Sequence, residues 1–503
     1  MIKNYKWLFL VALTFAACSD DEDNATNPAD EPITAGSADF SKYVPLGNSL
    51  TAGFSDNALF IRGQENSYPN HLAQQFALAG GGSFSIPYMS DNTGGLLFGG
   101  NVIMGPRLSV AGILATPGNP NPSYGPIVTP VPGAPTTEVT TPLSGPFNNM
   151  GIPGAKSYHL LAAGYGNAAG VPAGLANRYY VRFASSPGAS VIGDAVAQNP
   201  TFFSLWIGAN DVLTFATSGG VGVNQVGNPN PATYGNNDIT DPDVFNDVYR
   251  NLLDALTANG AKGVVANIPY VTSIPFFRTV PHNPIPMDAA TAQAVNGAYA
   301  AYNGGLAVAV NAGLITEEEK NRRTISFEAG TTNKLVIVDS YLTNLAALGL
   351  PSYRQATAED LPLLTARSFI GTTVGGNPQL INGVTVPLAD NWILSKDEVA
   401  EIKVATDEFN TSIRTLAQAK GLAIVDANAI LNQLYATGIR IGNFHMTASF
   451  VTGGAFSLDG VHPSARGYAY LANKFLEAIN ETYGSNFRGV NPMDYPIQYP
   501  VAF

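Results

Sequence analysis

The chain has 503 residues, of which 45% are apolar and only 12% are charged, and its formal net charge is −12. Apolar material is therefore ample for a large folded body, whereas the negative charge argues against a protein that binds nucleic acid through clustered Lys and Arg. The 52 glycines and 35 prolines indicate long irregular loops.

The N-terminus is typical of an exported protein. Lys3 and Lys6 precede an apolar run, residues 7–17, which ends in small residues before Cys18. This run is too short to span a bilayer as a mature helix, so residues 1–17 are predicted to be a signal peptide. Cys18 is the only cysteine of the chain, which excludes an intrachain disulfide.

The sequence around Cys18 resembles a bacterial lipobox. The resemblance implies that Cys18 carries the lipid, palmitate included, and becomes the first residue of a membrane-anchored protein; the alternative is a free cysteine in a plain secretory signal. The acidic residues 19–23 resemble the signal that sends lipoproteins of Bacteroidetes-type bacteria to the cell surface. They are equally typical of a solvated tether, and residues 18–40 are predicted to be flexible.

The first half of the body predicts strands and helices in alternation. A short strand covers 43–46, and a helix opens at Ser67-Tyr68-Pro69 and runs to about residue 78. A continuous apolar run at 202–207 is typical of a buried parallel strand. Asp241 then caps a helix that ends at Asn259-Gly260.

The pattern continues to the C-terminus. A strand at 264–268 is followed much later by a helix with a Ser395–Glu398 capping box, which runs to about residue 420. A strand at 422–425 comes next. A last helix presents one apolar face formed by Tyr468, Leu471, Phe475 and Ile479.

Alternating strands and helices predict an α/β fold with a parallel sheet, here a flavodoxin-like three-layer α/β/α sandwich. One domain at 41–485 accounts for the chain, and residues 486–503 form an extended tail. Long insertions are expected at about 80–146, 215–240 and 275–394. The last insertion contains a helical stretch near 287–320 and a strand at 335–338. The insertions either build the substrate pocket or form an accessory domain.

Four short segments carry residues suited to acyl transfer: Gly47–Leu50, Gly151–Ala155, Gly208–Asp211 and Asp459–Pro463. Each alone is ordinary, since Gly and Asn favour turns and Asp caps helices. Together, each follows an apolar run and precedes a polar or helical one. Ligands of parallel sheets bind at the carboxyl ends of strands, where three of the segments fall.

This ordered set resembles the SGNH hydrolases, or GDSL esterase/lipase family. The resemblance implies that Ser49 is the nucleophile, His462 the base and Asp459 its orienting partner. It also implies an oxyanion hole formed by the backbone N–H groups of Ser49 and Gly154 and by the Asn210 amide. The family more often has Asp at the position of Asn48, a supportive residue that does not accept the proton. No metal and no cofactor are required.

The remaining histidines and one acidic stretch are better explained by structural roles than by a second site. The remaining histidines, His71, His159, His282 and His445, lack a carboxylate at a comparable spacing. The acidic stretch at 238–247 would suggest calcium, but it lacks the EF-hand pattern, and helix capping explains much of it.

These features predict an outer-membrane lipoprotein, exposed at the cell surface, that hydrolyses carboxylic esters of acyl lipids. Two alternatives stay open. One is a carbohydrate esterase that deacetylates glycans, and the other is a binding lipoprotein without activity. Only the first function predicts a preference for longer acyl chains. Nothing in the sequence predicts an oligomeric state.

Overall fold

The computed structural model describes residues 31–112 and 127–503. The predicted signal peptide, Cys18 and the acidic stretch 19–23 lie outside the described residues. Thr34–Phe503 form one compact unit.

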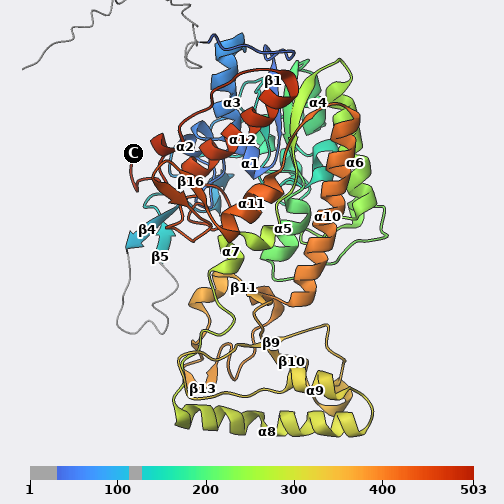
Figure 1. Cartoon of the computed structure of the whole chain (residues 1–503), viewed down its shortest axis with the longest axis vertical. Coiled ribbons are helices and arrows are strands. Elements are labelled where there is room, and N and C mark those ends of the chain that lie inside the picture. The colour runs from blue at the N-terminus through green and yellow to red at the C-terminus, as the bar shows by residue number, and fades with distance from the viewer. Residues whose placement is uncertain (1–30, 113–126) are drawn as a thin grey trace, which may run out of the picture. The chain divides into compact units, whose positions relative to one another are not determined.

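A parallel sheet of five strands forms the centre of this unit (Figure 1). The strand order is β6-β1-β7-β8-β15, and every neighbouring pair is parallel. The strands are almost entirely buried, which explains their continuous apolar sequences. Their bounds are β1 (Tyr43–Gly47), β6 (Met150–Gly151), β7 (Phe202–Trp206), β8 (Lys262–Ala266) and β15 (Ala423–Val425).

The four predicted strands are present within two residues of their expected ends. The fifth, β6, has only two residues and therefore has no periodicity to read. The α/β fold with a central parallel sheet is confirmed.

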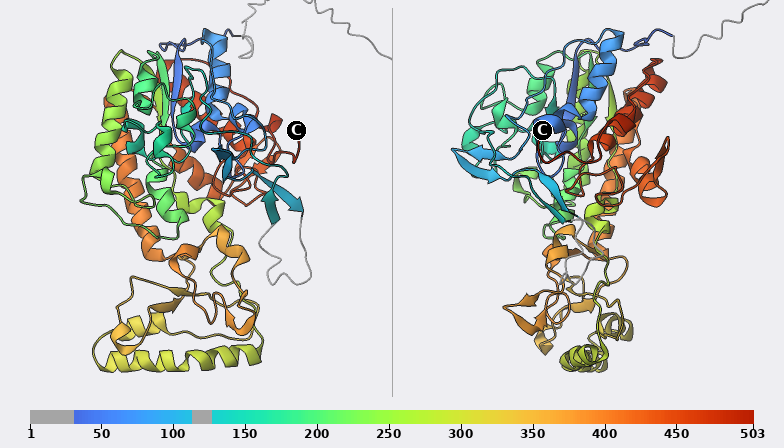
Figure 2. Two further views of the ribbon diagram at one scale, coloured as in Figure 1. Left: turned by 180° about the vertical axis from the view of Figure 1, so that it is seen from behind. Right: turned by 90° about the vertical axis from the view of Figure 1, so that its left-hand side faces the viewer.

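Helices pack against the sheet through side chains that alternate along the strands. On β7, Phe202 and Trp206 contact aromatic residues of α3 (Tyr68–Phe76) and α12 (Ala465–Tyr483). The intervening side chains of β7 join the main hydrophobic core, which also receives the apolar faces of α6 (Pro242–Thr257) and α10 (Lys396–Ala419). Figures 1 and 2 show these helices along the sheet.

The ends of the long helices follow the sequence signals. The Asp241 carboxylate accepts from the N–H groups of Asp243 and Val244 and so caps α6. Ser395 and Glu398 form the predicted capping box of α10. The other helices near the sheet are short: α1 (Ser49–Ala52), α2 (Ile61–Glu65), α4 (Val191–Val196), α5 (Asn210–Thr217), α7 (Pro275–Arg278) and α11 (Ala427–Ala436).

Short antiparallel hairpins lie outside the central sheet. The first insertion contains β2 (Leu96–Phe98) paired with β3 (Asn101–Met104), and β4 (Leu108–Gly112) paired with β5 (Ile127–Pro130). A third hairpin, β16 (Ile439–Ile441) and β17 (Phe444–Met446), follows α11. The second insertion, at 215–240, is a loop with one 3-10 turn, Pro231–Thr233.

The third insertion has a hydrophobic core of its own. Buried apolar residues between Val280 and Ile393 form a cluster separate from the main core, and Figure 1 shows α8 at the far end of this region. Its elements are α8 (Ala289–Asn311), α9 (Glu317–Arg323), β9 (Val336–Val338), β10 (Tyr353–Gln355), β11 (Leu361–Pro362), β12 (Thr373–Val374), β13 (Asn377–Ile381) and β14 (Ile393–Leu394).

The helical stretch expected near 287–320 is two helices. The backbone turns at Gly313, whose φ is +69°, and Thr316 then caps α9 through its hydroxyl. A glycine in the left-handed region ends a helix readily, and a new N-cap starts the next one.

The tether is shorter than predicted. Residues 34–40 pack on the body, because Ser37 donates to Tyr483 and the buried Phe40 ring stacks on Phe76. The tail after residue 486 contains one 3-10 turn, Pro492–Asp494, and otherwise no regular element.

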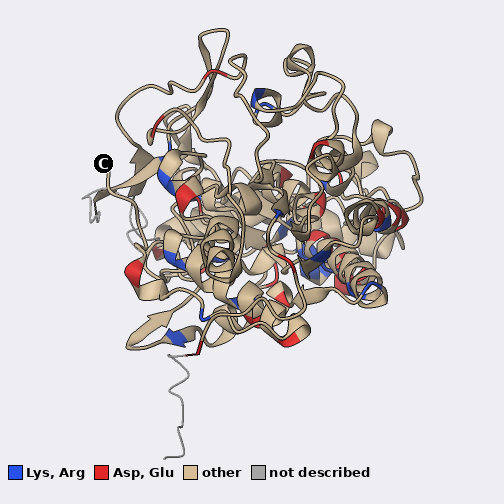
Figure 3. Ribbon diagram, turned by 90° about the horizontal axis from the view of Figure 1, so that it is seen from above, with Lys and Arg blue, Asp and Glu red and all other residues tan. Residues whose placement is uncertain are grey.

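Charged residues are spread thinly over the ribbon (Figure 3), as the low charged content requires. In the part of the chain that the structure describes, no helix is both long enough and apolar enough to cross a membrane.

Candidate active site

Ser49 lies at the sharp turn between the strand β1, which pairs with β6 and β7, and the helix α1. Strand β1 ends at Gly47, and Ser49 is already the first residue of α1. The Asn48 side chain accepts from the Leu50 N–H at 3.0 Å and caps the helix. Asn48 is only 1% exposed, so this turn is fixed from within the protein.

A continuous hydrogen-bonded chain joins Ser49, His462 and Asp459. His462 Nε2 lies 2.9 Å from Ser49 Oγ, and His462 Nδ1 lies 2.8 Å from Asp459 Oδ2. The serine and the histidine are 413 residues apart in sequence. The contact that the sequence motifs predict is therefore present, with the two imidazole nitrogens in the two expected directions.

Asp459 is held by hydrogen bonds from its own loop and from Asn57. Its Oδ1 accepts from the backbone N–H groups of Val461 and His462, each at 2.8 Å, and from the Ser457 hydroxyl at 3.0 Å. Its Oδ2 accepts from the Asn57 N–H at 2.9 Å. Burial alone would raise the pKa of Asp459, but the His462 imidazole and these N–H groups outweigh it and hold the pKa at about 2. Asp459 is thus an acceptor for the imidazole at neutral pH.

Gly154 and Asn210 follow the strands on either side of β1. In the sheet, Gly47 pairs with Gly151 of β6 on one side and with Trp206 of β7 on the other. Ser49 comes two residues after this register, Gly154 three and Asn210 four. The three residues therefore lie beyond the same carboxyl edge of the sheet.

Gly154 has a backbone that suits an exposed donor. Its φ is +83°, a conformation that glycine adopts without strain, and a side chain there would meet no atom within 4 Å. The residue is exposed. Among the described residues, no acceptor takes its backbone N–H, which leaves that group free for a ligand.

Asn210 is tied to the same loop. One N–H of its buried amide donates to the Ala155 carbonyl at 2.9 Å. The neighbouring Asp211 accepts from the backbone N–H of Ser157 at 2.9 Å and from its hydroxyl at 2.6 Å. Burial raises the pKa of Asp211 against these bonds and the nearby Lys156 ammonium. The start of α5 thus fixes the segment that carries Gly154.

A buried pair that the sequence does not reveal supports the Asp459 loop. The Asp56 carboxylate accepts from the Leu458 N–H at 2.9 Å and lies 4.0 Å from the Arg107 guanidinium. Burial raises the pKa of Asp56 to about 7, although the Leu458 N–H and Arg107 lower it. Arg107 also donates to the Pro500 and Val501 carbonyls and so ties the C-terminal tail to this layer.

The third insertion contacts the site at its near end. The Phe276 N–H donates to the Gly460 carbonyl at 2.9 Å, within the loop that joins Asp459 to His462. Leu364 packs in the same small cluster as Leu458. On the other side, the Phe54 ring lies 4.6 Å from the His462 ring. The Phe54 ring therefore borders the imidazole, and the third insertion packs on the loop that carries it.

The other histidines take no part in this hydrogen-bonded chain. His159 accepts from the Lys156 N–H, His445 contacts the Thr437 carbonyl, and His71 packs edge-on against Tyr495. Burial lowers the pKa of His71 and of His159 to about 4, and it lowers that of His282.

In the acidic stretch, the side chain of Asp238 accepts from Val223, Gly235 and Gln225, while Asp241 caps α6 and accepts from Gly227. The oxygens of these two carboxylates are thus used within the protein.

Comparison of the chain with protein-family models, with curated proteins and with solved structures gave no match. Cys18, the predicted lipidation site, lies outside the described residues.

Proposed function

We propose that this protein is a serine-dependent carboxylic-ester hydrolase of the SGNH type. The observation that supports the proposal is the chain of hydrogen bonds from Ser49 through His462 to Asp459. A serine hydroxyl is a weak nucleophile until a base removes its proton, and the base needs a partner that fixes its tautomer. The three residues have the residue types and the contacts for these roles.

In the first half of the reaction, Ser49 Oγ attacks the ester carbonyl carbon while His462 Nε2 takes the hydroxyl proton. Asp459 accepts from Nδ1–H and stabilises the imidazolium. The negative oxygen of the tetrahedral intermediate accepts from the N–H groups of Ser49 and Gly154 and from the Asn210 amide. As the C–O bond breaks, the imidazolium gives its proton to the departing alcohol, and the acyl group stays on Ser49.

In the second half, His462 Nε2 takes a proton from water as that water attacks the acyl-enzyme. The same donors stabilise the second oxyanion. Collapse returns the proton to Ser49 Oγ and releases the carboxylic acid. His462 takes and returns the proton in both halves of the reaction. The proposed reaction therefore requires no metal and no cofactor.

We further propose that the fold is flavodoxin-like. The strand order corresponds to 2-1-3-4-5 along the chain, which is the flavodoxin-like order, and helices contact both sides of β7. These features support a three-layer α/β/α sandwich. We further propose, from the lipobox and the acidic stretch, that a lipid on Cys18 anchors the protein to the outer membrane at the cell surface.

The proposal is tested with p-nitrophenyl acetate and a fluorophosphonate probe. Ser49→Ala should abolish turnover and labelling without unfolding, because it removes one hydroxyl from an intact turn. Ser326→Ala, which removes an exposed hydroxyl in the third insertion, is the matched control and should behave as wild type. Turnover retained in folded Ser49→Ala would refute the proposal, and so would a wild-type protein that neither hydrolyses esters nor reacts with the probe, as expected of a binding lipoprotein.

A further inference from the structure

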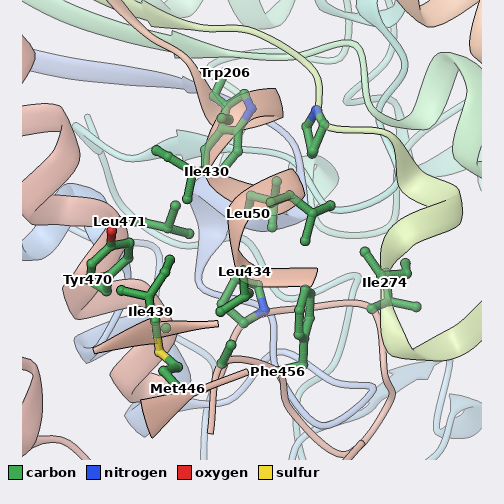
Figure 4. A pocket seen from close by; sticks show the side chains of 17 residues that line it. Leu50, Trp206, Ile274, Ile430, Leu434, Ile439, Met446, Phe456, Tyr470 and Leu471 are labelled. Atoms are coloured by element: carbon green, nitrogen blue, oxygen red, sulfur yellow. The ribbon is translucent and has the colours of Figure 1, made fainter. Parts of the chain in front are cut away.

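An apolar cavity lies beside the proposed nucleophile. Its volume is about 100 Å³, and its walls come from α1, the end of β7, α11, the β16–β17 hairpin, α12 and the loops before α7 and α12. Figure 4 shows the side chains of Leu50, Ile430, Leu434 and Phe456 around one space. Interiors of folded proteins are normally close-packed, so a cavity of this size is a distinct feature.

Several residues that line the cavity are sequence neighbours of the reacting residues. Leu50, which lines it, is the residue after Ser49, and Val461 and Pro463, which also line it, flank His462. Ser49 and His462 do not themselves line the cavity, but residues next to them in the chain form part of its wall, so the cavity lies next to the turn and the loop that carry the two reacting groups.

No side chain of the lining needs a hydrogen-bond partner inside the cavity. None of its side chains is charged. Trp206 already donates its indole N–H to the Asn267 carbonyl at 3.1 Å, and Figure 4 places the Tyr470 hydroxyl away from Leu434 and Phe456. A sugar in this space would leave its hydroxyl groups without partners, whereas a hydrocarbon chain would gain from burial.

We infer that this cavity binds the hydrocarbon chain of the acyl group, so that the substrates are esters of straight-chain fatty acids longer than acetate. The inference rests on the proposed function and gives its substrate class. The acyl chain is assigned rather than the alcohol because the alcohol must leave before water attacks. The group that remains covalently bound to Ser49 is the one that a neighbouring cavity can hold throughout both steps.

The first test is a series of p-nitrophenyl esters from acetate to decanoate. Each buried CH₂ contributes about 0.8 kcal/mol, or about fourfold in affinity. We therefore expect kcat/KM to rise by up to about fourfold per CH₂ until the cavity is filled. A flat profile, or a maximum at acetate, with full Ser49-dependent activity would overturn the inference and leave the proposed function standing. A rise with the alcohol chain in alkyl acetates, and none with the acyl chain, would also overturn it.

The second test changes the cavity. Ile430→Trp adds volume at a partly exposed wall and should lower kcat/KM for the octanoate ester by at least tenfold relative to the acetate ester. Val404→Trp places the same side chain on α10 at a position 58% exposed and is the matched control, with an unchanged profile. Equal losses for all chain lengths in a folded Ile430→Trp protein would contradict the assignment.

Two further measurements keep the inference testable if Ile430→Trp fails to fold. Leu434→Ala enlarges the cavity and should move the preferred chain length upward; an unchanged preference would count against the inference. Sodium decanoate should bind the Ser49→Ala protein in calorimetry with a negative heat-capacity change, the mark of apolar burial. The calorimetric measurement does not depend on turnover. Absence of decanoate binding would therefore refute the cavity assignment, whereas absence of all ester hydrolysis in wild type would refute the proposed function.

Discussion

Replacement of Asn210 by Ala should lower kcat, because it removes a proposed donor to the oxyanion. The Asn210 amide holds one N–H on the Ala155 carbonyl at 2.9 Å, which leaves its second N–H for the oxyanion. Loss of one such donor costs about 100- to 1000-fold in kcat. The substitution also removes the contact that fixes the segment after Gly154, so the loss should lie toward the upper end of that range. Substrate binding should change little, because the donor acts mainly in the transition state.

The assay is steady-state hydrolysis of p-nitrophenyl acetate, with kcat and KM measured separately. Asn210→Asp keeps the size of the side chain but replaces the donor by a carboxylate that repels both the oxyanion and the Ala155 carbonyl, so it should be at least as damaging. Asn246→Ala, on α6, is the matched control and should keep wild-type kcat. A folded Asn210→Ala protein whose kcat stays within about tenfold of wild type would show that this amide is not an oxyanion donor.

His462→Ala should be nearly as damaging as Ser49→Ala, and Asp459→Asn less so, because the latter disfavours the productive tautomer but keeps the base; equal kcat/KM losses in both would contradict these roles. Burial raises the pKa of Asp56 from 3.8 to about 7, so the folded state binds this proton more tightly than the unfolded state does, and ionisation as pH rises lowers the free energy of unfolding. Between pH 5 and pH 8 this loss should be roughly 3 kcal/mol and absent from Asp56→Asn, measured by urea unfolding; parallel curves for the two proteins would refute it. Cys18→Ser should stop incorporation of radiolabelled palmitate and release the protein from the membrane, and palmitate in the variant would disprove the lipobox. Ala at all of residues 20–23 should leave lipidation intact but reduce protease accessibility on whole cells, unless that stretch is only a tether.

The sheet could be predicted because its strands are fully buried. Strands such as 202–206 consist of uninterrupted apolar residues, and turn or cap residues mark their ends. The helices α6 and α10 were equally readable, since Asp241 and the Ser395–Glu398 pair cap them as the sequence indicates. Ser49, Gly154 and Asn210 could be placed at one carboxyl edge by the same logic, whereas the contact between Ser49 and His462 was expected from the motifs that resemble the SGNH hydrolases.

Other features depend on contacts that no local pattern encodes. Asp56 and Arg107 are 51 positions apart, in irregular segments, and nothing in either segment indicates that they face each other. The cavity beside Ser49 is likewise formed by residues of several helices, strands and loops that lie far apart in the sequence, and each is ordinary core material on its own. The packing of residues 34–40 was missed because Phe40 is one apolar residue in a polar run, and only its aromatic partners bury it.

Asn48, where the family that the motifs resemble more often has Asp, has a physical explanation in the turn. Asn48 caps α1 with its side-chain oxygen, which accepts from the Leu50 N–H, and an N-cap requires only such an acceptor. The residue is 1% exposed, and a neutral amide costs less to bury there than a carboxylate would. The chemistry that we propose takes its proton acceptor from His462 and its negative charge from Asp459, so it needs no charge at position 48. Asn in place of Asp therefore preserves the geometry of the nucleophile and removes nothing that the proposed mechanism uses.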